Sequence, residues 1–289
     1  MNTANLEYLV CPITKEALTT DNSTKLKSVK SNNTYQIIDG MPNLTYPESL
    51  FESDKEFNDK YDTNAQFYDD GMKWLFDSFF EDEDTVRRKL IKPLNIKEDD
   101  FILNMGCGTG SDSFYIAELL GKKGKLFNFD LSEQLLRIAK KKLSNTNANL
   151  EFILGNGSYL PFADQTFDSV FHFGGINAFS EKQKAIQEMV RVTKKGGRVV
   201  FGDEGAAPWL SELEYGKIIK NANPLYKHTP PIDLLPINAQ DVSIDYVLGN
   251  SFYVISFTVG QDSKLNLDLP IPGKRGGTLR SRYENPEKY

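Results

Sequence analysis

Short apolar runs alternate with amphipathic segments through the middle of the chain. The runs, which have the length and composition of buried strands, lie at 101–105, 125–130, 150–155, 168–174 and 197–204. The segments with helical spacing of apolar residues lie between them, at 111–120, 132–143 and 181–195. Strands and helices in alternation indicate a parallel sheet with right-handed crossovers. We therefore predict a doubly wound, mostly parallel α/β core of Rossmann-like type over residues 99–260.

The flanking regions have different patterns. Residues 242–249 and 251–259 are alternating runs that meet at Gly249-Asn250, which predicts an antiparallel hairpin at the sheet edge. Residues 48–98 are acidic, rich in aromatic residues and helical in pattern, so we expect a cap segment there. Residues 1–47 contain short apolar pieces typical of a small β-rich domain of two or three strands, and residues 261–289 are polar, typical of a tail or flap.

Composition narrows the class of protein. The 289 residues are 39% hydrophobic and 26% charged with a mean hydropathy of -0.44, and no apolar run approaches the ~20 residues of a membrane span. The first residues lack the pattern of a secretory signal, so a cytoplasmic protein is expected. Cys11 and Cys107 are the only cysteines, too few for a disulfide framework or a cysteine-built zinc site. We expect no metal site.

The charge is unevenly distributed. There are 34 basic and 40 acidic residues, giving -6, and residues 51–100 alone contain fifteen acids against eight bases. No basic stripe is present that would neutralise a phosphate backbone, so the sequence disfavours a nucleic-acid partner. A small-molecule substrate is the expected partner, and the oligomeric state is left open.

A glycine-rich loop follows the first strand of the core. Its residues Asn104, Gly106, Cys107, Gly108 and Gly110 precede the segment 111–120, which is predicted to be helical. Such glycines let the backbone approach a ligand, and a helix N-terminus offers free N–H groups. A dinucleotide fingerprint would need Gly or Ala at position 111, where serine stands, so the spacing suits a single adenosine-bearing ligand. A tight strand-to-helix turn without a ligand is the alternative.

Two further pieces support a nucleoside site. Asp130 closes the second strand, where an acid can reach both ribose hydroxyls, and Leu131 would then lie against the adenine. The alternative role of Asp130, capping the next helix, is already filled by Ser132. The third strand is followed by Asn156, Gly157 and Ser158, and Asn156 is a candidate partner of the adenine amino group.

These motifs occur in an order that resembles a known family. GCGTG, FDLS, GNGSYLPF, FDSVFHFGGINAF and EMVRVTKKGGRVV are similar to the signature of class I S-adenosylmethionine-dependent methyltransferases, in the branch of the ubiquinone and menaquinone methyltransferases. The resemblance covers about residues 60–205. It departs from the family pattern at Asn104 and Asn156, where an acid is usual; each amide keeps an acceptor oxygen but carries no charge.

The resemblance implies S-adenosyl-L-methionine as cofactor and S-adenosyl-L-homocysteine as product. It implies that residues 106–110 cradle the methionine part, that Asp130 holds the ribose, that Asn156 meets the adenine, and that the backbone near His172 and Phe173 touches the methionine end. Tyr61 and Tyr68 resemble a stretch that folds over the cofactor in such enzymes. Packing in the core is the alternative for these two tyrosines.

The N-terminal segment resembles a different family. LEYLVCPITKEAL and NTYQIIDGMPNL are similar to a small zinc-ribbon domain that occurs as a methyltransferase activator and in a bacterial 23S rRNA guanine methyltransferase. That domain has two cysteine pairs, whereas here Cys11 stands without partners and Thr14 occupies the second position. The resemblance implies a ribbon that has lost its metal and acts as a packing unit or a lid on the substrate side.

Methyl transfer from a sulfonium is an in-line displacement, and a base is needed only for a nucleophile that carries a weakly acidic proton. Candidates at the ends of the last two parallel strands are His172, Asn177 and Glu204, with Asp203 beside them. His172 is as readily explained as a buried imidazole and Glu204 as a surface carboxylate. An aromatic roof suited to an apolar or aromatic acceptor, or simply core, is expected from Phe67, Tyr68, Trp74, Phe76, Phe79 and Phe80.

The sequence therefore predicts a small-molecule methyltransferase. A methyltransferase acting on rRNA or tRNA bases is the alternative, supported by the degenerate ribbon and by a basic cluster at Lys274, Arg275, Arg280 and Arg282. A cofactor-binding module without catalysis is a second alternative, suggested by the two asparagine departures.

Overall fold

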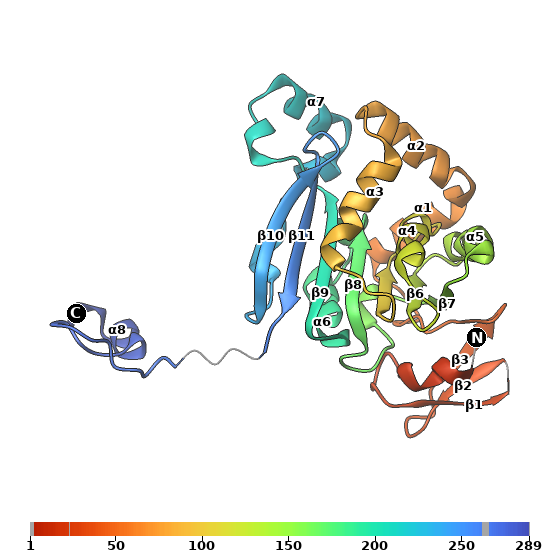
Figure 1. Ribbon diagram of the computed structural model, residues 1–289, viewed down its shortest axis with the longest axis horizontal. Helices are drawn as coiled ribbons and strands as arrows, with labels where there is room; N and C mark the ends of the chain where they lie inside the picture. The colour runs from red at the N-terminus through yellow and green to blue at the C-terminus, as the bar shows by residue number, and fades with distance from the viewer. Residues whose placement is uncertain (1–2, 23, 262–265, 289) are drawn as a thin grey trace.

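The computed structural model describes residues 3–22, 24–261 and 266–288. A seven-stranded sheet with the order β10-β11-β9-β8-β5-β6-β7 forms its centre (Figure 1). Strands β9, β8, β5, β6 and β7 run parallel to one another. Strand β11 pairs antiparallel with β9, and the edge strand β10 pairs antiparallel with β11. The predicted α/β class with a C-terminal hairpin is confirmed. The strands are β5 (Phe101–Met105), β6 (Lys125–Asp130), β7 (Asn149–Leu154), β8 (Phe167–Phe173), β9 (Thr193–Glu204), β10 (Ala239–Val247) and β11 (Phe252–Val259).

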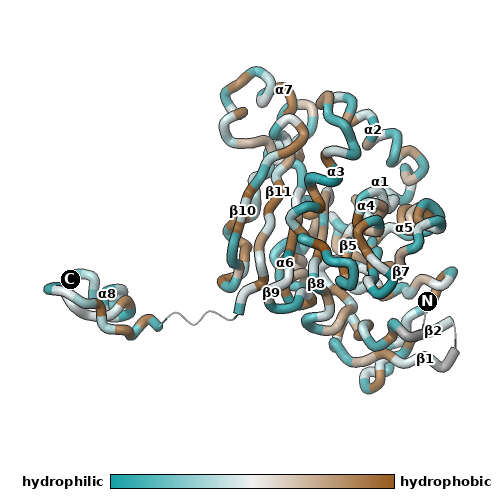
Figure 2. The backbone as a smooth tube through the Cα atoms, viewed as in Figure 1, coloured by the Kyte–Doolittle hydropathy of each residue, from teal (hydrophilic) through white to brown (hydrophobic). Residues whose placement is uncertain are grey.

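The central strands contribute to a hydrophobic core on each face of the sheet, because successive side chains point to opposite faces. Leu103 and Val170 pack in the core that contains α6 (Lys182–Val192). Ile102 and Phe171 pack in the core that contains α3 (Glu83–Ile91) and α4 (Ser111–Leu119). Helix α5 (Glu133–Lys142) contacts β6 and β7. Figure 2 shows hydrophobic residues along β11 and hydrophilic residues on the edge strand β10.

The N-terminal unit is a separate antiparallel sheet with the order β1-β2-β3-β4. It has four strands where two or three were predicted, because Met41–Pro42 adds a short fourth strand by pairing with β3. The unit packs on the α6 side of the main sheet, and Lys15 forms an ion pair with Glu188 of α6 at 2.8 Å. Its elements are η1 (Thr3–Tyr8), β1 (Leu18–Asn22), β2 (Lys25–Ser28), β3 (Thr34–Ile38) and β4 (Met41–Pro42).

Cys11 lies buried inside the N-terminal unit. Its Sγ lies 3.0 Å from the hydroxyl of Tyr35 and accepts a hydrogen bond from the backbone N–H of Thr14 at 3.5 Å. Thr14 therefore contacts Cys11 from the position that a second ligand has in the zinc-ribbon pattern. Among the described residues, no group of three or more His, Cys, Asp or Glu side chains is arranged to hold a metal ion. The resemblance to a zinc ribbon stays a prediction.

A helical segment lies between the two sheets in the sequence and covers one end of the main sheet (Figure 1). It comprises α1 (Glu52–Asn64), the 3-10 turn η2 (Ala65–Phe67), α2 (Tyr68–Ser78) and α3. The start of α3 is capped by the Asp82 carboxylate, which accepts a hydrogen bond from the Thr85 N–H at 2.9 Å. Acids occupy the first turn of α3 and bases its last turn, as the helix dipole favours.

The helix predicted over 181–195 ends earlier than expected. Helix α6 stops at Val192, and Thr193 begins β9 by pairing with Phe167. Lysines after an apolar helical face are typical of a helix C-terminus, which favoured the longer helix. Here the backbone hydrogen bonds of the sheet outweigh that local preference, and Lys194 pairs with Asp168 at 2.8 Å instead.

Two α-helices follow β9 in the described part of the chain. Helix α7 (Glu214–Ala222) precedes the edge hairpin, and α8 (Leu279–Glu284) lies apart from the main body in Figure 1. Arg280 of α8 pairs with Asp268 of the same terminal segment at 2.9 Å. The tail or flap role of 261–289 stays a prediction, and its residues 262–265 and 289 lie outside the described part. In the ranges that the structure describes, no helix is long and apolar enough to cross a bilayer.

Candidate functional site

The site lies at the carboxyl ends of the parallel strands, where the chain leaves β5 and β8 in opposite directions. The loop after β5 turns through Gly106 and Gly108, whose φ angles are +67° and +54°. A Cβ at Gly106 would lie 3.0 Å from the His172 ring, and one at Gly108 would lie 3.5 Å from the Tyr68 hydroxyl. Glycine is therefore favoured at both positions by the positive φ angle, and at Gly106 also because a Cβ would crowd the His172 ring.

Asp130, at the end of β6, holds the glycine loop in place. Its carboxylate accepts hydrogen bonds from the N–H groups of Gly108, at 2.7 Å, and Ser132, at 2.8 Å. Burial raises the pKa of Asp130 to about 6, against the hydrogen bonds that favour the charged form. A carboxylate has about four acceptor positions, so acceptor capacity remains for a hydroxyl donor. Ser132 caps α5 through its Oγ, which confirms that role.

Three aspartates of the covering segment attach it to the loops that follow the strands. Asp54 accepts a hydrogen bond from the Asn156 side chain, after β7, at 3.1 Å. Asp62 accepts from the Ser132 hydroxyl, in the loop after β6. Asp69 accepts from the loop after β5 and also pairs with Lys142 of α5. Part of the local acid excess therefore fastens α1 and α2 over the site.

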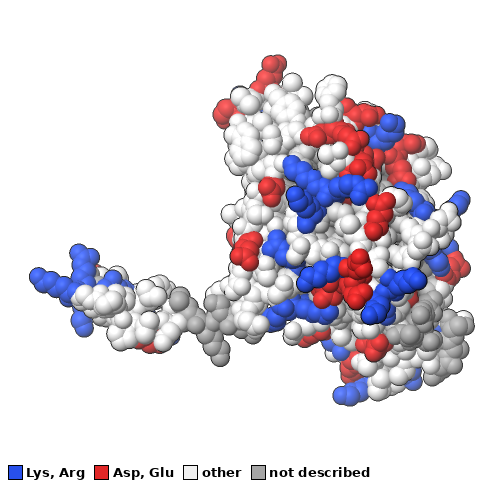
Figure 3. Space-filling view, viewed as in Figure 1, with Lys and Arg blue, Asp and Glu red and all other residues white. Residues whose placement is uncertain are grey.

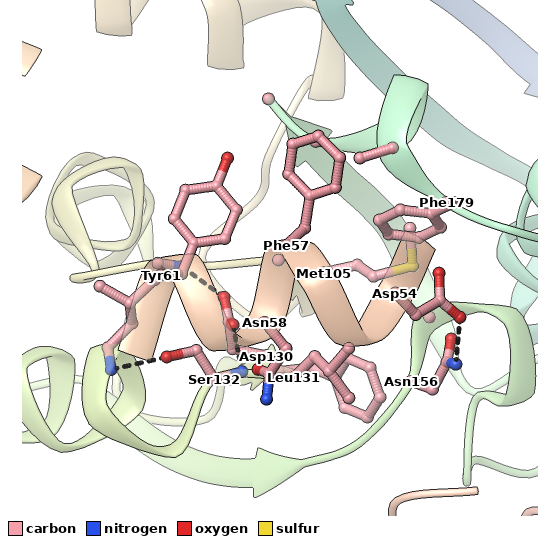
Figure 4. Close-up of a pocket in the computed structure, with 18 of the residues that line it drawn as sticks. Asp54, Phe57, Asn58, Tyr61, Met105, Asp130, Leu131, Ser132, Asn156 and Phe179 are labelled. Atoms are coloured by element: carbon pink, nitrogen blue, oxygen red, sulfur yellow. Dashed lines mark hydrogen bonds between the residues drawn. The ribbon is translucent and has the colours of Figure 1, made fainter. Parts of the chain in front are cut away.

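The space between this segment and the strand ends is a cavity (Figure 4). Phe57, Asn58 and Tyr61 of α1 line one side of it. The opposite side is lined by the strand ends and their loops, including Gly106, Gly108, Asp130, Leu131, Gly155, Asn156, Gly157 and His172.

Two residues that line this cavity each carry a buried polar atom without a hydrogen-bond partner among the described residues. These atoms are Oδ1 of Asn58 and Nε2 of His172. The other ring nitrogen of His172 lies 2.7 Å from the Met105 carbonyl, which can only accept, so Nδ1 carries the proton and Nε2 is an acceptor. Burial lowers the pKa of His172, which favours this neutral form. With Asp130, the cavity thus presents acceptors suited to a ligand rich in hydroxyl and amino groups, which fits a nucleoside.

A second cavity adjoins the first and shares Phe57, Tyr61 and Tyr68 with it. Its further lining is mostly apolar and aromatic: Phe67, Met72, Leu75, Phe173, Leu225 and Phe252. Its polar residues include Lys60, Asn64, Asn177, Asp203 and Glu204. A molecule with an apolar ring and one polar edge would match this lining.

The acid pair in the second cavity is held rigidly. Asp203 accepts hydrogen bonds from the N–H of Asn177 at 2.6 Å and from the N–H of Glu204 at 2.8 Å. The Asn177 amide donates to the Glu204 carbonyl at 2.7 Å, and its oxygen accepts from the Tyr253 hydroxyl at 3.1 Å. Burial, and the hydrogen bond and charge of Asp203, raise the pKa of Glu204 well above its usual range. This shift favours the protonated form of Glu204.

Most of the predicted site residues lie around these cavities. Phe173, Asn177 and Glu204 line the second cavity, and Cys107 lines a small neighbouring pocket with Tyr68. The residues Tyr68, Gly106, Gly108, Asp130, Leu131, Asn156, Gly157 and His172 line the first cavity.

Three predicted residues line neither the two cavities nor the small neighbouring pocket. Asn104 is buried and donates to the Ser113 hydroxyl at 2.8 Å, because its side chain points toward α4. Gly110 packs against α5, and Ser158 donates its N–H to the Asn156 side chain at 2.9 Å. These residues support the loops.

The six aromatic residues expected to form a roof or core divide into three groups. Phe67 and Tyr68 line the second cavity. Phe76 belongs to the core under α3, and Phe79 packs on Phe252. Trp74 and Phe80 are exposed. Helical periodicity explains the difference, since residues on one helix point in several directions.

Sequence reasoning singled out Tyr61 but missed the rest of the inner face of α1. Asp54, Phe57, Asn58 and Tyr61 follow a spacing of three and four, so they share one face of the helix, and all four line the first cavity. The spacing could have been recognised in the sequence, but the four residues mix polar and aromatic side chains, which is not the pattern of a buried helix face.

The sheet order and the position of the site define a class: a Rossmann-like fold with a cavity at its switch point, as in class I methyltransferases. Residues 52–209 match the ubiE/COQ5 methyltransferase family, and the chain belongs to this family. The predicted relationship to the ubiquinone and menaquinone methyltransferases is thereby confirmed.

Individual relatives agree with this assignment. The chain is 30% identical over 156 residues to the ubiquinone/menaquinone biosynthesis C-methyltransferase UbiE of Francisella tularensis subsp. novicida, covering 49% of this chain and 62% of that protein. It is 34% identical over 122 residues to the demethylmenaquinone methyltransferase of Oceanobacillus iheyensis, covering 42% of this chain and 51% of that protein. The chain thus spans between half and two thirds of the length of these relatives.

A solved structure shares the fold. It is a chain of the complex between the Haloferax volcanii Trm112 methyltransferase activator and a methyltransferase, with a TM-score of 0.52 at 14% identity. The similarity covers 72% of this chain and 99% of that chain.

Proposed function

We propose that this protein is an S-adenosylmethionine-dependent methyltransferase acting on a small acceptor with an apolar or aromatic ring. The observation that carries the proposal is the pair of adjoining cavities that share Phe57, Tyr61 and Tyr68. The first is lined by acceptors suited to a nucleoside and the second by apolar side chains with a polar edge. Because the two cavities adjoin at these residues, a methyl donor in the first cavity and a methyl acceptor in the second can come into contact.

The cofactor supplies a methyl group on a sulfonium. In this proposal the loop from Gly106 to Gly110, with Cys107, holds its methionine part, and Phe173 borders that end. Asp130 receives the ribose hydroxyls, Leu131 lies against the adenine, and Asn156 lies at the adenine end. Gly157 lets the chain pass close to Phe179, where a Cβ would lie 2.7 Å from the ring.

The chain's own residues orient the acceptor and exclude water. Alignment of reacting groups is worth about 7–11 kcal/mol in well-oriented intramolecular reactions. His172, neutral and with a free acceptor nitrogen, is placed to receive a proton or a hydrogen bond. Glu204, whose raised pKa favours the protonated form, donates a hydrogen bond to an oxygen of the acceptor, and Asn177 holds the Glu204 backbone in position.

The relatives' names suggest the acceptor more closely. They are methyltransferases of ubiquinone and menaquinone biosynthesis, and one is named for demethylmenaquinone. A reduced quinone ring of that kind has the apolar faces and oxygen edge that the second cavity suits. We propose such a ring as the acceptor.

The charge distribution does not favour the RNA alternative. On the face shown in Figure 3, lysines and arginines are interspersed with acids, and the covering segment is acidic. The exception is the cationic C-terminal segment, where Arg280 is already paired with Asp268. Counterion release by a basic surface is the main source of nonspecific RNA affinity, and such a surface is missing from this face.

Isothermal calorimetry with S-adenosylhomocysteine tests the cofactor assignment. Wild-type protein should bind it, and Asp130→Ala should weaken binding about tenfold or more because a charged acceptor of two hydroxyls is lost. Asp59→Ala is the matched control, since Asp59 lies on the exposed side of α1. No binding by the wild type, or equal binding by Asp130→Ala, would contradict the proposal.

Turnover requires a second assay. Purified protein with S-adenosylmethionine and a reduced demethylmenaquinone of short side chain should produce a compound heavier by one methylene, detected by mass spectrometry. Cofactor binding without any methylated product from this acceptor or from a metabolite extract would favour the non-catalytic alternative.

A further inference from the structure

Asp54 is a buried acid at the adenine end of the first cavity. Its side chain comes from α1, is 6% exposed, and lines the cavity next to Asn156 (Figure 4). One carboxylate oxygen accepts from the Ser180 N–H at 2.8 Å and the other from the Asn156 amide at 3.1 Å. Within the described ranges, no lysine or arginine forms an ion pair with it.

A carboxylate in such a position has unused acceptor capacity. Two of its about four acceptor positions are filled, and both partners are neutral donors. A buried charge with so few donors is costly unless further donors reach it. One turn further along the same face, Asn58 has a buried Oδ1 with no partner among the described residues. The inner face of α1 therefore presents to the cavity a carboxylate with acceptor capacity left and an amide oxygen without a partner among the described residues.

The order of the strands shows which part of a ligand would meet these acceptors. β5, β6 and β7 are neighbours in the sheet, and they end in the glycine loop, in Asp130 and in the loop of Asn156 respectively. A ligand whose methionine part lies at the first loop and whose ribose lies at the second extends its base toward the third. The donor that adenine offers along its polar edge is the exocyclic amino group.

We propose that Asp54 recognises the exocyclic amino group of the cofactor's adenine and so makes the site specific for an aminopurine. This inference rests on the proposed function. Because Asp54 belongs to the covering segment, the same contact ties α1 to the bound cofactor. The neighbouring residue on the sheet side of the cavity is Asn156, whose amide donates a hydrogen bond to Asp54. Of these two side chains, only the one from the covering segment is a carboxylate.

A pair of ligands that differ at one position tests the recognition. S-adenosylhomocysteine carries the amino group, whereas S-inosylhomocysteine carries an oxygen there and presents a lone pair to the carboxylate. Calorimetry should give a preference of the wild type for the first ligand of about tenfold to a hundredfold, the range for hydrogen bonds to charged groups. Asp54→Asn should reduce the preference to less than about threefold, since an amide can either accept or donate.

The exchange variant separates recognition from folding. In Asp54→Asn with Asn156→Asp, the amide and the carboxylate trade places, so each backbone N–H, of Ser180 and Ser158, keeps an acceptor and the contact between the two side chains persists. This double variant should recover the preference for the amino ligand. Asn156→Asp alone places two carboxylates together and should weaken binding of both ligands.

Matched controls distinguish recognition from attachment of the cover. Asp62→Asn loosens α1 at the loop after β6 without changing the lining of the first cavity. It should therefore weaken the binding of both ligands equally and leave the ratio of their affinities unchanged. A wild-type ratio near one, or an unchanged ratio in Asp54→Asn, would overturn the inference while leaving the proposed function intact. Failure of the wild type to bind S-adenosylhomocysteine would instead contradict the proposed function itself.

Discussion

Replacing Asp130 by asparagine should stabilise the ligand-free protein at pH 8 and weaken its binding of S-adenosylhomocysteine. The side chain is 8% exposed, and burial raises its pKa from 3.8 to about 6. A difference of about two pKa units corresponds to about 3 kcal/mol by which ionised Asp130 disfavours folding above pH 6. Asparagine removes this cost because it carries no charge.

The substitution also removes an acceptor. The two backbone N–H groups, of Gly108 and Ser132, each bind one carboxylate oxygen, and an amide can serve only one of them. Leaving one buried donor unsatisfied costs about 1–3 kcal/mol. The net change in the free energy of unfolding at pH 8 should therefore lie between about zero and 2 kcal/mol in favour of the variant.

The pH dependence gives the sharper test. Because folding raises the pKa of Asp130, the protonated side chain contributes stability that is complete below pH 3.8 and is lost as the pH rises through about 6. The stability of the variant relative to the wild type should therefore decrease by about 1.4 kcal/mol between pH 8 and pH 5. Other titrating groups are present in both proteins and cancel in the difference.

Urea unfolding at the two pH values, followed by circular dichroism, measures this difference, with Asp59→Asn as the exposed control. A variant that is less stable than the wild type by more than about 1 kcal/mol at pH 8 would show that the backbone hydrogen bonds outweigh desolvation. A difference in stability that is the same at pH 5 and pH 8 would refute the raised pKa.

Three further substitutions test the structure. Arg87→Ala leaves Asp112, its partner at 2.8 Å, with an unpaired and mostly buried charge and should destabilise by about 3–5 kcal/mol in urea unfolding; a loss below about 1 kcal/mol would contradict a buried ion pair. Gly155→Ala places a Cβ 2.7 Å from the Phe129 ring and should lower the free energy of unfolding by about 1–3 kcal/mol, which an unchanged melting temperature would disprove. Because folding raises the pKa of Glu204, the wild type takes up a proton on folding. Its free energy of unfolding should therefore fall, relative to that of Glu204→Gln, by up to about 1.4 kcal/mol per pH unit between pH 6 and 8. The same pH dependence in both proteins would mean that Glu204 is ionised when folded.

The backbone of the site could be predicted from the sequence because its determinants are local. The strands and helices of the core follow from apolar periodicity within each segment. Gly106 and Gly108 mark a loop that only glycine allows, and their positive φ angles agree with this. Asp130 and Ser132 follow β6 directly, so their places at the cavity and at the start of α5 are set by the strand's end.

Other features depended on partners distant in the sequence. Asn104 stands beside the glycine loop, yet its amide turns to Ser113 on α4 and away from the cavity. The end of α6 was decided by the pairing of Thr193 with Phe167, since a strand partner outweighs a helix-like sequence. Asp54 reaches Asn156 across 102 residues, a contact that no local pattern contains.

The sequence by itself determined which segments form strands, which loop carries the glycines and which acid closes β6, because backbone conformation responds to neighbours in the chain. The tertiary structure alone decided which faces of α1 and α2 cover the cavities and which polar atoms there lack partners. It also decided that Glu204 lies against Asp203, which raises the pKa of Glu204. A side chain's burial and its hydrogen-bond partners set its charge, and both depend on segments that meet only when the chain has folded.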